Sequence, residues 1–104
     1  MKILLDECLP LDLRHHFDQH DAHTAQWAGF KGKKNSELIR CAVEAGYGVL
    51  ITVDQGIRRH WTTGCENIVL LRSRTNQLED LVPLIASIRD KLRTIRPGEF
   101  VAIP

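Results

Sequence analysis

The segment Gly48-Val49-Leu50-Ile51-Thr52-Val53-Asp54 decides the fold, because it joins a short, β-branched apolar run to an acidic residue. A segment of the same form, Lys2-Ile3-Leu4-Leu5-Asp6-Glu7, stands near the start of the chain. Both runs are too short and too β-branched for helices, so we predict two buried strands. In an open parallel sheet, ligands bind beyond the carboxyl ends of the strands, near the point where strand order reverses. Asp6 and Asp54 are therefore expected at one edge of the sheet.

Two acids at one edge repel each other unless a cation lies between them, so this pair indicates a divalent-metal site. Glu37 is expected to join them, because it lies in the first turn of a helix that leads into the strand ending at Asp54. Three carboxylates suit Mg²⁺ or Mn²⁺, which take oxygen ligands and keep several waters. Such an ion activates water and neutralises charge developing on a phosphate. A helix cap or turn is the alternative for any single acid.

Length and composition fit one ordinary globular domain. The chain has 104 residues, 43% hydrophobic and 26% charged, and no apolar stretch approaches the length of a membrane span. The N-terminus leads straight into a predicted strand, so we expect no signal peptide. Cys8, Cys41 and Cys65 are widely spaced, which favours reduced thiols in the cytoplasm over a structural zinc site. The net charge of +1 neither requires nor excludes a nucleic-acid partner.

Strand and helix patterns alternate along the chain, which is typical of an α/β domain with a parallel sheet. We predict one domain over residues 1–104, with a mostly parallel central sheet of four to five strands flanked by helices. Its crossover connections are expected to be right-handed. The predicted strands are residues 3–5, 22–25, 49–53, 67–72 and 99–103. The predicted helices are residues 10–19, 35–45 and 78–95, with a short helix or turn at 55–61.

Local features of two helices lead to more specific expectations. Asn35 is a favourable N-cap. The face of its helix that we expect to be buried comprises Leu38, Ile39, Ala42 and Val43. Asn76 to Glu79 has the form of a capping box. Pro83 would cost roughly 3 kcal/mol inside a helix, so we expect a kink or two abutting helices there. Pro97-Gly98 predicts a turn before the last strand.

Basic and aromatic residues near the same edge are candidates for contacting a nucleic acid. Arginines that follow the strands could clamp phosphates, and lysines line the loop before Asn35. These cations are Arg58, Arg59, Arg72, Arg74, Lys31, Lys33 and Lys34. Thr52 and Ser73 are suited to hold metal-bound waters, and Trp27 and Trp61 to stack on unpaired bases. The substrate-binding set that we predict comprises Arg58, Arg59, Arg74, Lys34 and Thr52. Solvated surface is the alternative for each cation, and core or subunit interface for the tryptophans.

Four histidines crowd one segment: His15, His16, His20 and His23. His16 and His20 have the i, i+4 spacing with which a helix can bind zinc. No glutamate lies between them as in the His-Glu-x-x-His pattern, and no cysteine is near. An exposed helix face is therefore the preferred interpretation of this segment.

Three strings of the sequence carry a family resemblance: Ile3-Leu4-Leu5-Asp6-Glu7-Cys8-Leu9-Pro10, Asn35-Ser36-Glu37-Leu38-Ile39-Arg40-Cys41-Ala42 and Leu50-Ile51-Thr52-Val53-Asp54. Together they resemble the short PIN-like proteins of bacteria and archaea, relatives of the PIN-domain ribonucleases that include the VapC toxins. The likeness covers nearly the whole chain, including the segment Asn76 to Leu81 and the closing Pro97-Gly98-Glu99. The combination of the opening string with Thr-x-Asp is fairly specific, whereas either part alone is weak.

This resemblance implies a three-layer PIN-like fold, an acidic pocket that binds Mg²⁺ or Mn²⁺, and hydrolysis of RNA phosphodiesters. Asp6 matches the first-strand aspartate of the family, and Asp54 matches the aspartate of its Thr-x-Asp motif. Asn35 stands where the family usually has an aspartate, and the mid-chain acidic helix of full-length PIN domains is missing. Asparagine is a neutral, weaker oxygen ligand, so Glu37 is expected to supply the missing charge.

Three functions from different classes are compatible with these residues. The leading hypothesis is a metal-dependent ribonuclease of toxin type, in which Asp6, Glu37 and Asp54 assist attack by water and an antitoxin covers the pocket. The second is a PIN-like scaffold with a weakened site that binds RNA or protein, which Asn35 favours. The third is a receiver-like domain in which Asp6 and Glu7 hold Mg²⁺ and Asp54 accepts a phosphoryl group. It would need a lysine after the last strand, where this sequence has only Ile103-Pro104. A homodimer is a further expectation.

Overall fold

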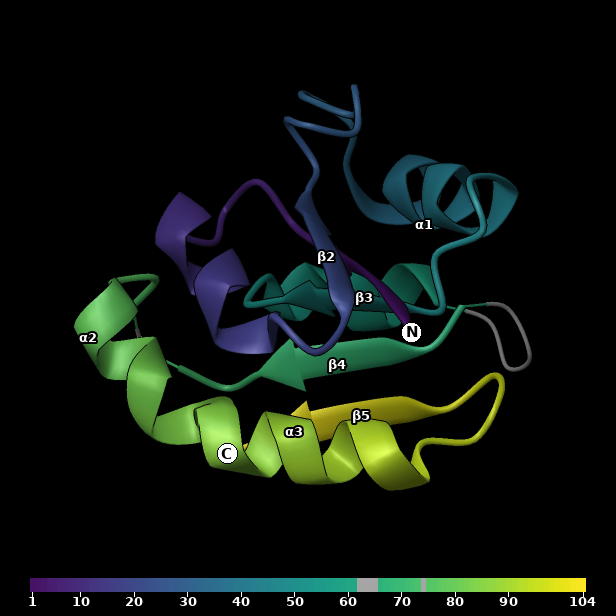
Figure 1. Cartoon of the computed structure of the whole chain (residues 1–104). Coiled ribbons are helices and arrows are strands. Elements are labelled where there is room, and N and C mark those ends of the chain that lie inside the picture. Colours follow the sequence, from purple (N-terminus) through teal and green to yellow (C-terminus); the bar gives the residue numbers. More distant parts are fainter. Residues whose placement is uncertain (62–65, 74) are drawn as a thin grey trace.

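Five parallel strands form one sheet in the computed structural model, which describes residues 1–61, 66–73 and 75–104. They are β1 (Lys2–Leu5), β2 (Asp21–Thr24), β3 (Val49–Thr52), β4 (Ile68–Leu71) and β5 (Phe100–Ile103). Their order is β2-β1-β3-β4-β5 (Figure 1), so the predicted parallel sheet of four to five strands is confirmed. Every residue of β3 and β4 is buried, as expected for strands that are covered on both faces.

Helical segments cover both faces of the sheet and produce three layers. The 3₁₀ helix η1 (Leu11–Phe17) packs on one face, together with the broken helix formed by α2 (Leu78–Leu81), η3 (Val82–Leu84) and α3 (Ile85–Thr94). Helix α1 (Asn35–Glu44) and the 3₁₀ helix η2 (Gln55–His60) pack on the other face. Alternate strand residues point to opposite faces, so Leu5 and Ile51 join the first core whereas Leu4 and Leu50 join the second.

The connection from β4 to β5 has the opposite hand to the three connections before it. The chain moves in one direction across the sheet from β3 through β4 to β5, yet η2 covers one face and α3 covers the other. Figure 1 shows α3 in front of β5, and this face together with the direction from β4 to β5 makes the last crossover left-handed. The prediction that all crossovers are right-handed is therefore wrong here. The short η1 cannot cover its whole face, and Ile85, Ile88 and Leu92 of α3 cover the remainder.

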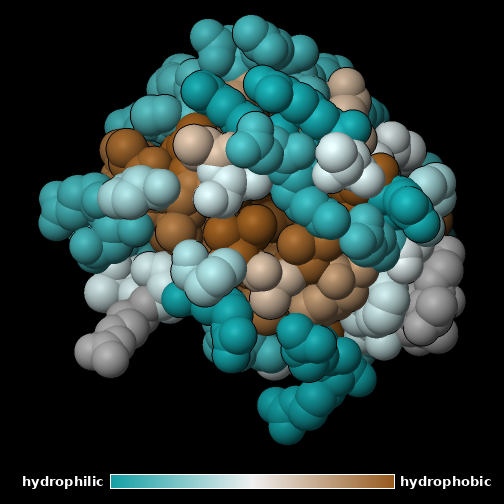
Figure 2. All heavy atoms as spheres, turned by 90° about the horizontal axis from the view of Figure 1, so that it is seen from below, coloured by the Kyte–Doolittle hydropathy of each residue, from teal (hydrophilic) through white to brown (hydrophobic). Residues whose placement is uncertain are grey.

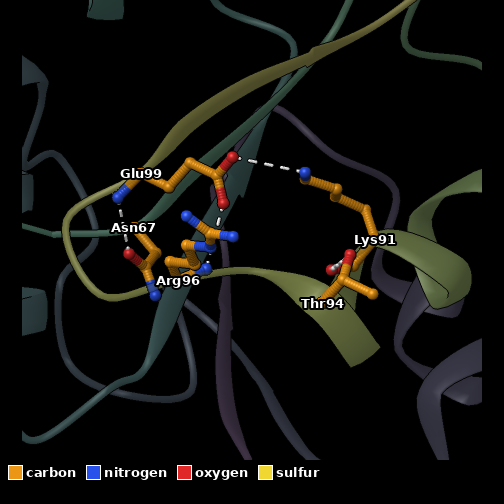
Figure 3. Close-up of polar contacts among 5 residues, drawn as sticks. All are labelled: Asn67, Lys91, Thr94, Arg96 and Glu99. Carbon is orange, nitrogen blue, oxygen red and sulfur yellow. Dashed lines mark hydrogen bonds and ion pairs between the residues drawn. The ribbon is translucent and has the colours of Figure 1, made fainter.

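A polar cluster closes this left-handed connection (Figure 3). The Asn67 side-chain oxygen accepts a 2.9 Å hydrogen bond from the Glu99 N–H, which joins the residue before β4 to the residue before β5. The Glu99 carboxylate accepts the Arg96 N–H at 3.0 Å and lies 3.2 Å from Lys91 Nζ. These contacts lower the pKa of Glu99, the Arg96 N–H most and the Lys91 ammonium next. The ionised Glu99 thus holds the turn at Pro97-Gly98 against α3.

The start of α1 departs from the expected N-cap. Lys34 is the N-cap residue, and Asn35 is the first helical residue, with a positive φ of 53° that asparagine tolerates better than most residues. No side-chain hydrogen bond caps this end of the helix. Leu38, Ile39 and Ala42 are buried as predicted. Val43 is 50% exposed, because it lies at the margin of the apolar stripe.

Other helix boundaries also differ in detail from the expectations. Residues 11–17 form a 3₁₀ helix in place of the helix expected over residues 10–19. The predicted capping box is wrong, because the Asn76 side chain donates a 2.9 Å hydrogen bond to the Cys8 carbonyl. The break at Pro83 is confirmed, since this residue lies in η3 between α2 and α3. The turn at Pro97-Gly98 is also confirmed, with a φ of 77° at Gly98.

Figure 2 views the molecule from the side of β5 and α3, where an apolar strip crosses the surface between hydrophilic side chains. Three of the four β5 residues are only partly buried, so this edge of the sheet is open to solvent. Such strips are typical of surfaces that contact other proteins. Within the described ranges, no helix has the length and apolar character needed to cross a membrane.

Glu66 is a buried carboxyl group that gives the fold a pH dependence. It is 5% exposed, and burial raises its pKa to about 7. In the unfolded chain the group ionises near 4.5, so the folded chain binds more protons between these values and loses stability as pH rises through them. We predict that Glu66→Gln stabilises the protein at pH 8 by about 2–3 kcal/mol, and has little effect at pH 4.

Urea denaturation at both pH values checks this prediction. The exposed residue Glu79 provides the control, because Glu79→Gln removes the same charge from a side chain that is already in contact with solvent. A Glu66→Gln variant that is less stable than the native chain at pH 8 would contradict the assignment of a costly buried charge.

Candidate functional site

Asp6 and Asp54 lie where the strand order reverses. Asp6 directly follows β1, Asp54 follows β3 by two residues, and these two strands pair in parallel. The connection from β1 covers one face through η1 and that from β3 covers the other through η2, so their carboxyl ends flank a crevice. A pocket of about 210 Å³ opens here, lined by Asp6, Glu7, Cys8, Lys34, Asn35, Val53 and Asp54. The predicted convergence of Asp6 and Asp54 is confirmed.

The Thr52 hydroxyl joins the two aspartates. It donates a 2.7 Å hydrogen bond to Asp6 Oδ2 and accepts the Asp54 N–H at 3.0 Å. Thr52 is fully buried, so its predicted contact with substrate is wrong. Its position at the end of β3 instead makes it a positioning residue, which fixes one oxygen of Asp6 and the backbone of Asp54. The Cys8 sulfur lies 3.7 Å from the same hydroxyl oxygen.

The environment of Asp6 disfavours the ionised form of its carboxyl group. Asp6 is 9% exposed, and its pKa is raised chiefly by burial and to a smaller degree by the charge of Asp54. Hydrogen bonds from Thr52 and the Glu7 N–H act in the opposite direction without offsetting the burial. Burial also raises the pKa of the Cys8 thiol, with the charge of Asp6 as the next cause. Cys8 therefore stays protonated and is unsuited to act as a nucleophile.

Asp54 is oriented by the start of η2. Its Oδ1 atom accepts a 2.9 Å hydrogen bond from the Gly56 N–H and caps this 3₁₀ helix. A Cβ atom on residue 56 would lie 3.1 Å from this oxygen and 3.8 Å from Arg59 Nη2. Glycine thus leaves room for both groups on this side of η2, although the Arg59 guanidinium and the Asp54 carboxylate form no ion pair. Arg59 is exposed, so it remains accessible to a phosphate at the pocket.

The start of α1 brings Lys34 and Asn35 to the same pocket. The Asn35 carboxamide offers a neutral oxygen ligand, and the exposed Lys34 ammonium offers positive charge. Glu7, which was predicted at the site only in the receiver-like alternative, also lines the pocket. Its carboxylate accepts the Gly32 N–H at 2.9 Å and so ties the end of β1 to the loop before α1. Its place next to Asp6 was the signal that could have identified it.

Glu37 does not line this pocket, contrary to the expectation that it supplies a third carboxylate. Successive helical residues are rotated by about 100°, so a residue two positions after Asn35 points to nearly the opposite side of the helix. The Glu37 side chain is 49% exposed, and its Oε2 atom lies 3.9 Å from Lys33 Nζ. Within the described residues, no three His, Cys, Asp or Glu side chains are grouped to hold a metal ion. The candidate ligands of the pocket are therefore Asp6, Asp54 and the neutral Asn35, while the Glu7 carboxylate at the same pocket is engaged by the Gly32 N–H.

The remaining predicted cations have different locations. The Arg58 guanidinium stacks 4.4 Å from the centre of the Phe100 ring, at the amino end of β5, so it points away from the pocket. Arg74 lies outside the described residues. Arg72 is exposed beyond β4, and the Ser73 hydroxyl accepts the Thr75 N–H at 3.3 Å. Lys34 and Arg59 are therefore the predicted substrate-binding cations that the structure places at or near the pocket.

The two tryptophans have different environments. Trp61 is partly buried, donates a 2.6 Å hydrogen bond to the Glu66 carbonyl and packs on Phe100 with ring centres 5.4 Å apart. Trp61 therefore packs against the second core, in agreement with the alternative to base stacking. Trp27 is 71% exposed and stacks on His23 with ring centres 4.1 Å apart.

His16 and His20 do not share a helix, because η1 ends at Phe17, so the helical i, i+4 spacing is not realised. His23 is held by the Tyr47 hydroxyl, 2.9 Å from Nδ1, and by Asp21, 3.0 Å from Nε2. His15 is exposed and lies 4.0 Å from Asp12. The carbonyl group of His16 accepts a hydrogen bond from Arg89 Nε at 2.9 Å, which links η1 to α3. These contacts join the histidine segment to neighbouring parts of the fold, so they are structural.

Comparisons with known proteins add no identification. No protein-family model matches the chain, and no curated protein or solved structure matches it significantly.

Because burial and the charge of Asp54 disfavour the ionised form of Asp6, we predict that its neutral isostere stabilises the fold. We expect Asp6→Asn to raise the melting temperature by a few degrees at pH 7 without divalent ions, because it removes a buried charge and its repulsion with Asp54 while keeping an acceptor for Thr52. Differential scanning calorimetry measures the shift. Glu37→Gln is the control, since an exposed ion pair contributes little. A lower melting temperature for Asp6→Asn would contradict the claim that the buried charge of Asp6 destabilises the fold.

Proposed function

We propose that the chain is a metal-dependent ribonuclease of the PIN-like type, acting on RNA phosphodiesters. One observation carries the proposal: carboxylates from two neighbouring parallel strands share a pocket with an amide ligand and a lysine at the point where strand order reverses. The resemblance of the opening string and the Thr-x-Asp motif to PIN-like proteins supports the same activity. A catalytic role for Glu37 is not part of the proposal, because its side chain faces elsewhere.

The residues of the pocket fit a weakly held Mg²⁺ or Mn²⁺ ion. Mg²⁺ is commonly bound through one or two carboxylates, with waters and substrate phosphates as its other ligands. Asp6 and Asp54 supply two carboxylates, and Asn35 supplies a neutral oxygen. The pKa of Asp6 is raised by burial and, to a smaller degree, by the charge of Asp54, and a bound cation would favour the ionised form of both carboxylates.

Each residue of the pocket has a distinct task in the proposed reaction. Asp6 and Asp54 bind the ion, and Thr52 holds Asp6 in the orientation needed. When bound, the ion supplies an activated water and neutralises charge on the phosphate. Lys34 and Arg59 hold the phosphate oxygens of the RNA backbone. Asp6 must be ionised to bind metal, so its raised pKa predicts that binding weakens with falling pH earlier than for an ordinary aspartate.

The partners and cellular location belong to the same proposal. An antitoxin that covers the pocket would regulate a ribonuclease of toxin type, and a homodimer stays a prediction. Cys8 and Cys41 are free thiols, which supports a reducing compartment such as the cytoplasm.

Binding and cleavage by matched variants test the proposed activity. We expect Mn²⁺ to bind with millimolar or tighter affinity in calorimetry, and single-stranded RNA transcripts to be cleaved only when Mg²⁺ or Mn²⁺ is present. Asp6→Asn and Asp54→Asn should each lower binding and cleavage by roughly 100-fold or more. The control is Asp90→Asn, which removes a charge from the exposed face of α3. Cleavage by Asp6→Asn at the native rate would refute the proposal.

Asn35 allows the strength of the site to be increased. Asn35→Asp adds a further carboxylate at the pocket, and aspartate also tolerates the positive φ of this position. We expect Mn²⁺ affinity to rise about tenfold, which corresponds to about 1.4 kcal/mol, and cleavage to rise with it. Ser36→Asp is the matched control, because it adds the same charge at the next, exposed position outside the pocket. Equal effects of the two variants would show that Asn35 is not a ligand.

A binding module with a weakened site is the second candidate function. The neutral Asn35 in the pocket favours it, and so does the engagement of the Glu7 carboxylate by the Gly32 N–H. In that case the native chain would bind RNA without cleaving it at any Mn²⁺ concentration, and Asn35→Asp would increase metal binding but not create cleavage.

A further inference from the structure

Strand β2 is an open edge of the sheet that presents backbone groups to solvent. The Asp21 N–H donates to the Met1 carbonyl at 3.1 Å, and the Ala25 N–H donates to the Leu5 carbonyl at 2.8 Å, so these alternate residues face β1. In a parallel ladder the residues between them face the other way. Ala22 and Thr24 therefore turn their N–H groups outward, where no strand formed by the described residues pairs with β2. Ala22 is partly exposed, whereas Thr24 is 6% exposed and its carbonyl already accepts the Ala28 N–H. Such an edge is a template for a further strand.

A groove runs along this open edge. Its volume is about 680 Å³, and it is lined by Leu11, Arg14, Ala22, His23, Thr24, Gln26 and Trp27. η1 provides one wall, and the residues that follow β2 provide the other. Leu11 is 51% and Trp27 71% exposed, so each wall carries a large apolar side chain that is uncovered. The edge of β2 thus lies between apolar walls, which suits an extended chain with alternating side chains.

Two polar groups of the groove specify its occupant further. The Gln26 side-chain oxygen is buried and has no hydrogen-bond partner among the described residues, so an incoming backbone N–H would satisfy it. Arg14 is exposed, whereas His23 is already engaged by Tyr47 and Asp21. Among the lining residues Arg14 carries a permanent positive charge, and its guanidinium also donates to the Leu11 carbonyl at 2.8 Å. The Arg14 charge favours a carboxylate on the occupant.

We propose that the β2 groove binds an extended, carboxylate-bearing polypeptide segment of a partner protein, which adds a sixth strand to the sheet. Its backbone pairs with Ala22 and Thr24, its apolar side chains pack on Leu11 and Trp27, and a carboxylate pairs with Arg14. This surface lies beside β2 and shares no lining residue with the pocket of Asp6 and Asp54, so the proposal stands independently of the nuclease activity.

Matched proline substitutions on the two edge strands, β2 and β5, test the proposal. Ala22→Pro removes an outward N–H while the bonds of β2 to β1 remain, and Ala102→Pro makes the same change on the outward side of β5. The probes are linear random 12-residue peptides displayed on phage and selected on the full-length native chain. Enriched peptides are then synthesised, and their affinities are measured by calorimetry for both variants, for Arg14→Gln and for Trp27→Ala.

We expect enriched peptides to carry an acid among alternating apolar residues, and hydrogen exchange to slow at Ala22 and Thr24 when they bind. Ala22→Pro and Trp27→Ala should each weaken binding at least tenfold and Arg14→Gln several-fold, with Ala102→Pro unchanged. Because Trp27 is exposed, its variant keeps the test valid if Ala22→Pro fails to fold. The proposal is overturned if selection enriches nothing, if the peptides ignore Ala22→Pro and Trp27→Ala, or if the native chain is a dimer that these variants dissociate.

Discussion

The hydroxyl group of Thr52 is the contact on which the proposed site depends. It donates to Asp6 Oδ2 and accepts the backbone N–H of Asp54, so a single buried atom fixes the ends of two neighbouring strands. Parallel pairing of β1 with β3 brings the acids together, and Thr52 orients the Asp6 carboxylate and holds the backbone of Asp54. Because Thr52 is fully buried, water does not compete for these bonds. The arrangement keeps a costly carboxylate in place for a cation.

The fold was largely predictable because its signals are local. Short apolar runs, the alternation of strands with helices, and Pro83 each act through neighbouring residues, and the structure confirms the sheet and the helix break that they predict. The left-handed crossover was not predictable in this way. It depends on how much of one face η1 covers, which is a property of packing between distant elements. The Asn76 side chain likewise bonds the distant Cys8 carbonyl, so the local capping pattern did not predict its partner.

The site was predictable where topology decides it and unpredictable where side-chain direction does. Asp6 and Asp54 follow adjacent strands, so any parallel pairing of β1 with β3 brings them together. Glu37 was misplaced because the rotation from Asn35 along α1 carries it to the other side of the helix. Arg58 follows the right strand but runs along η2 to the ring of Phe100. Sequence proximity to a strand end therefore identifies backbone positions better than it identifies ligands.

The two open edges of the sheet give the molecule surfaces that are separate from the pocket. β2 is lined by a groove, whereas the edge of β5 belongs to the apolar strip of Figure 2. Parallel sheets are usually covered, so these edges are natural places for partners.

Anomalous diffraction from crystals soaked in Mn²⁺ tests the shared carboxylate site most directly. The account predicts one strong peak within about 2.5 Å of an oxygen of Asp6 and an oxygen of Asp54. A structure in which Mn²⁺ binds elsewhere, or in which the two carboxylates stay apart at saturating Mn²⁺, would contradict it.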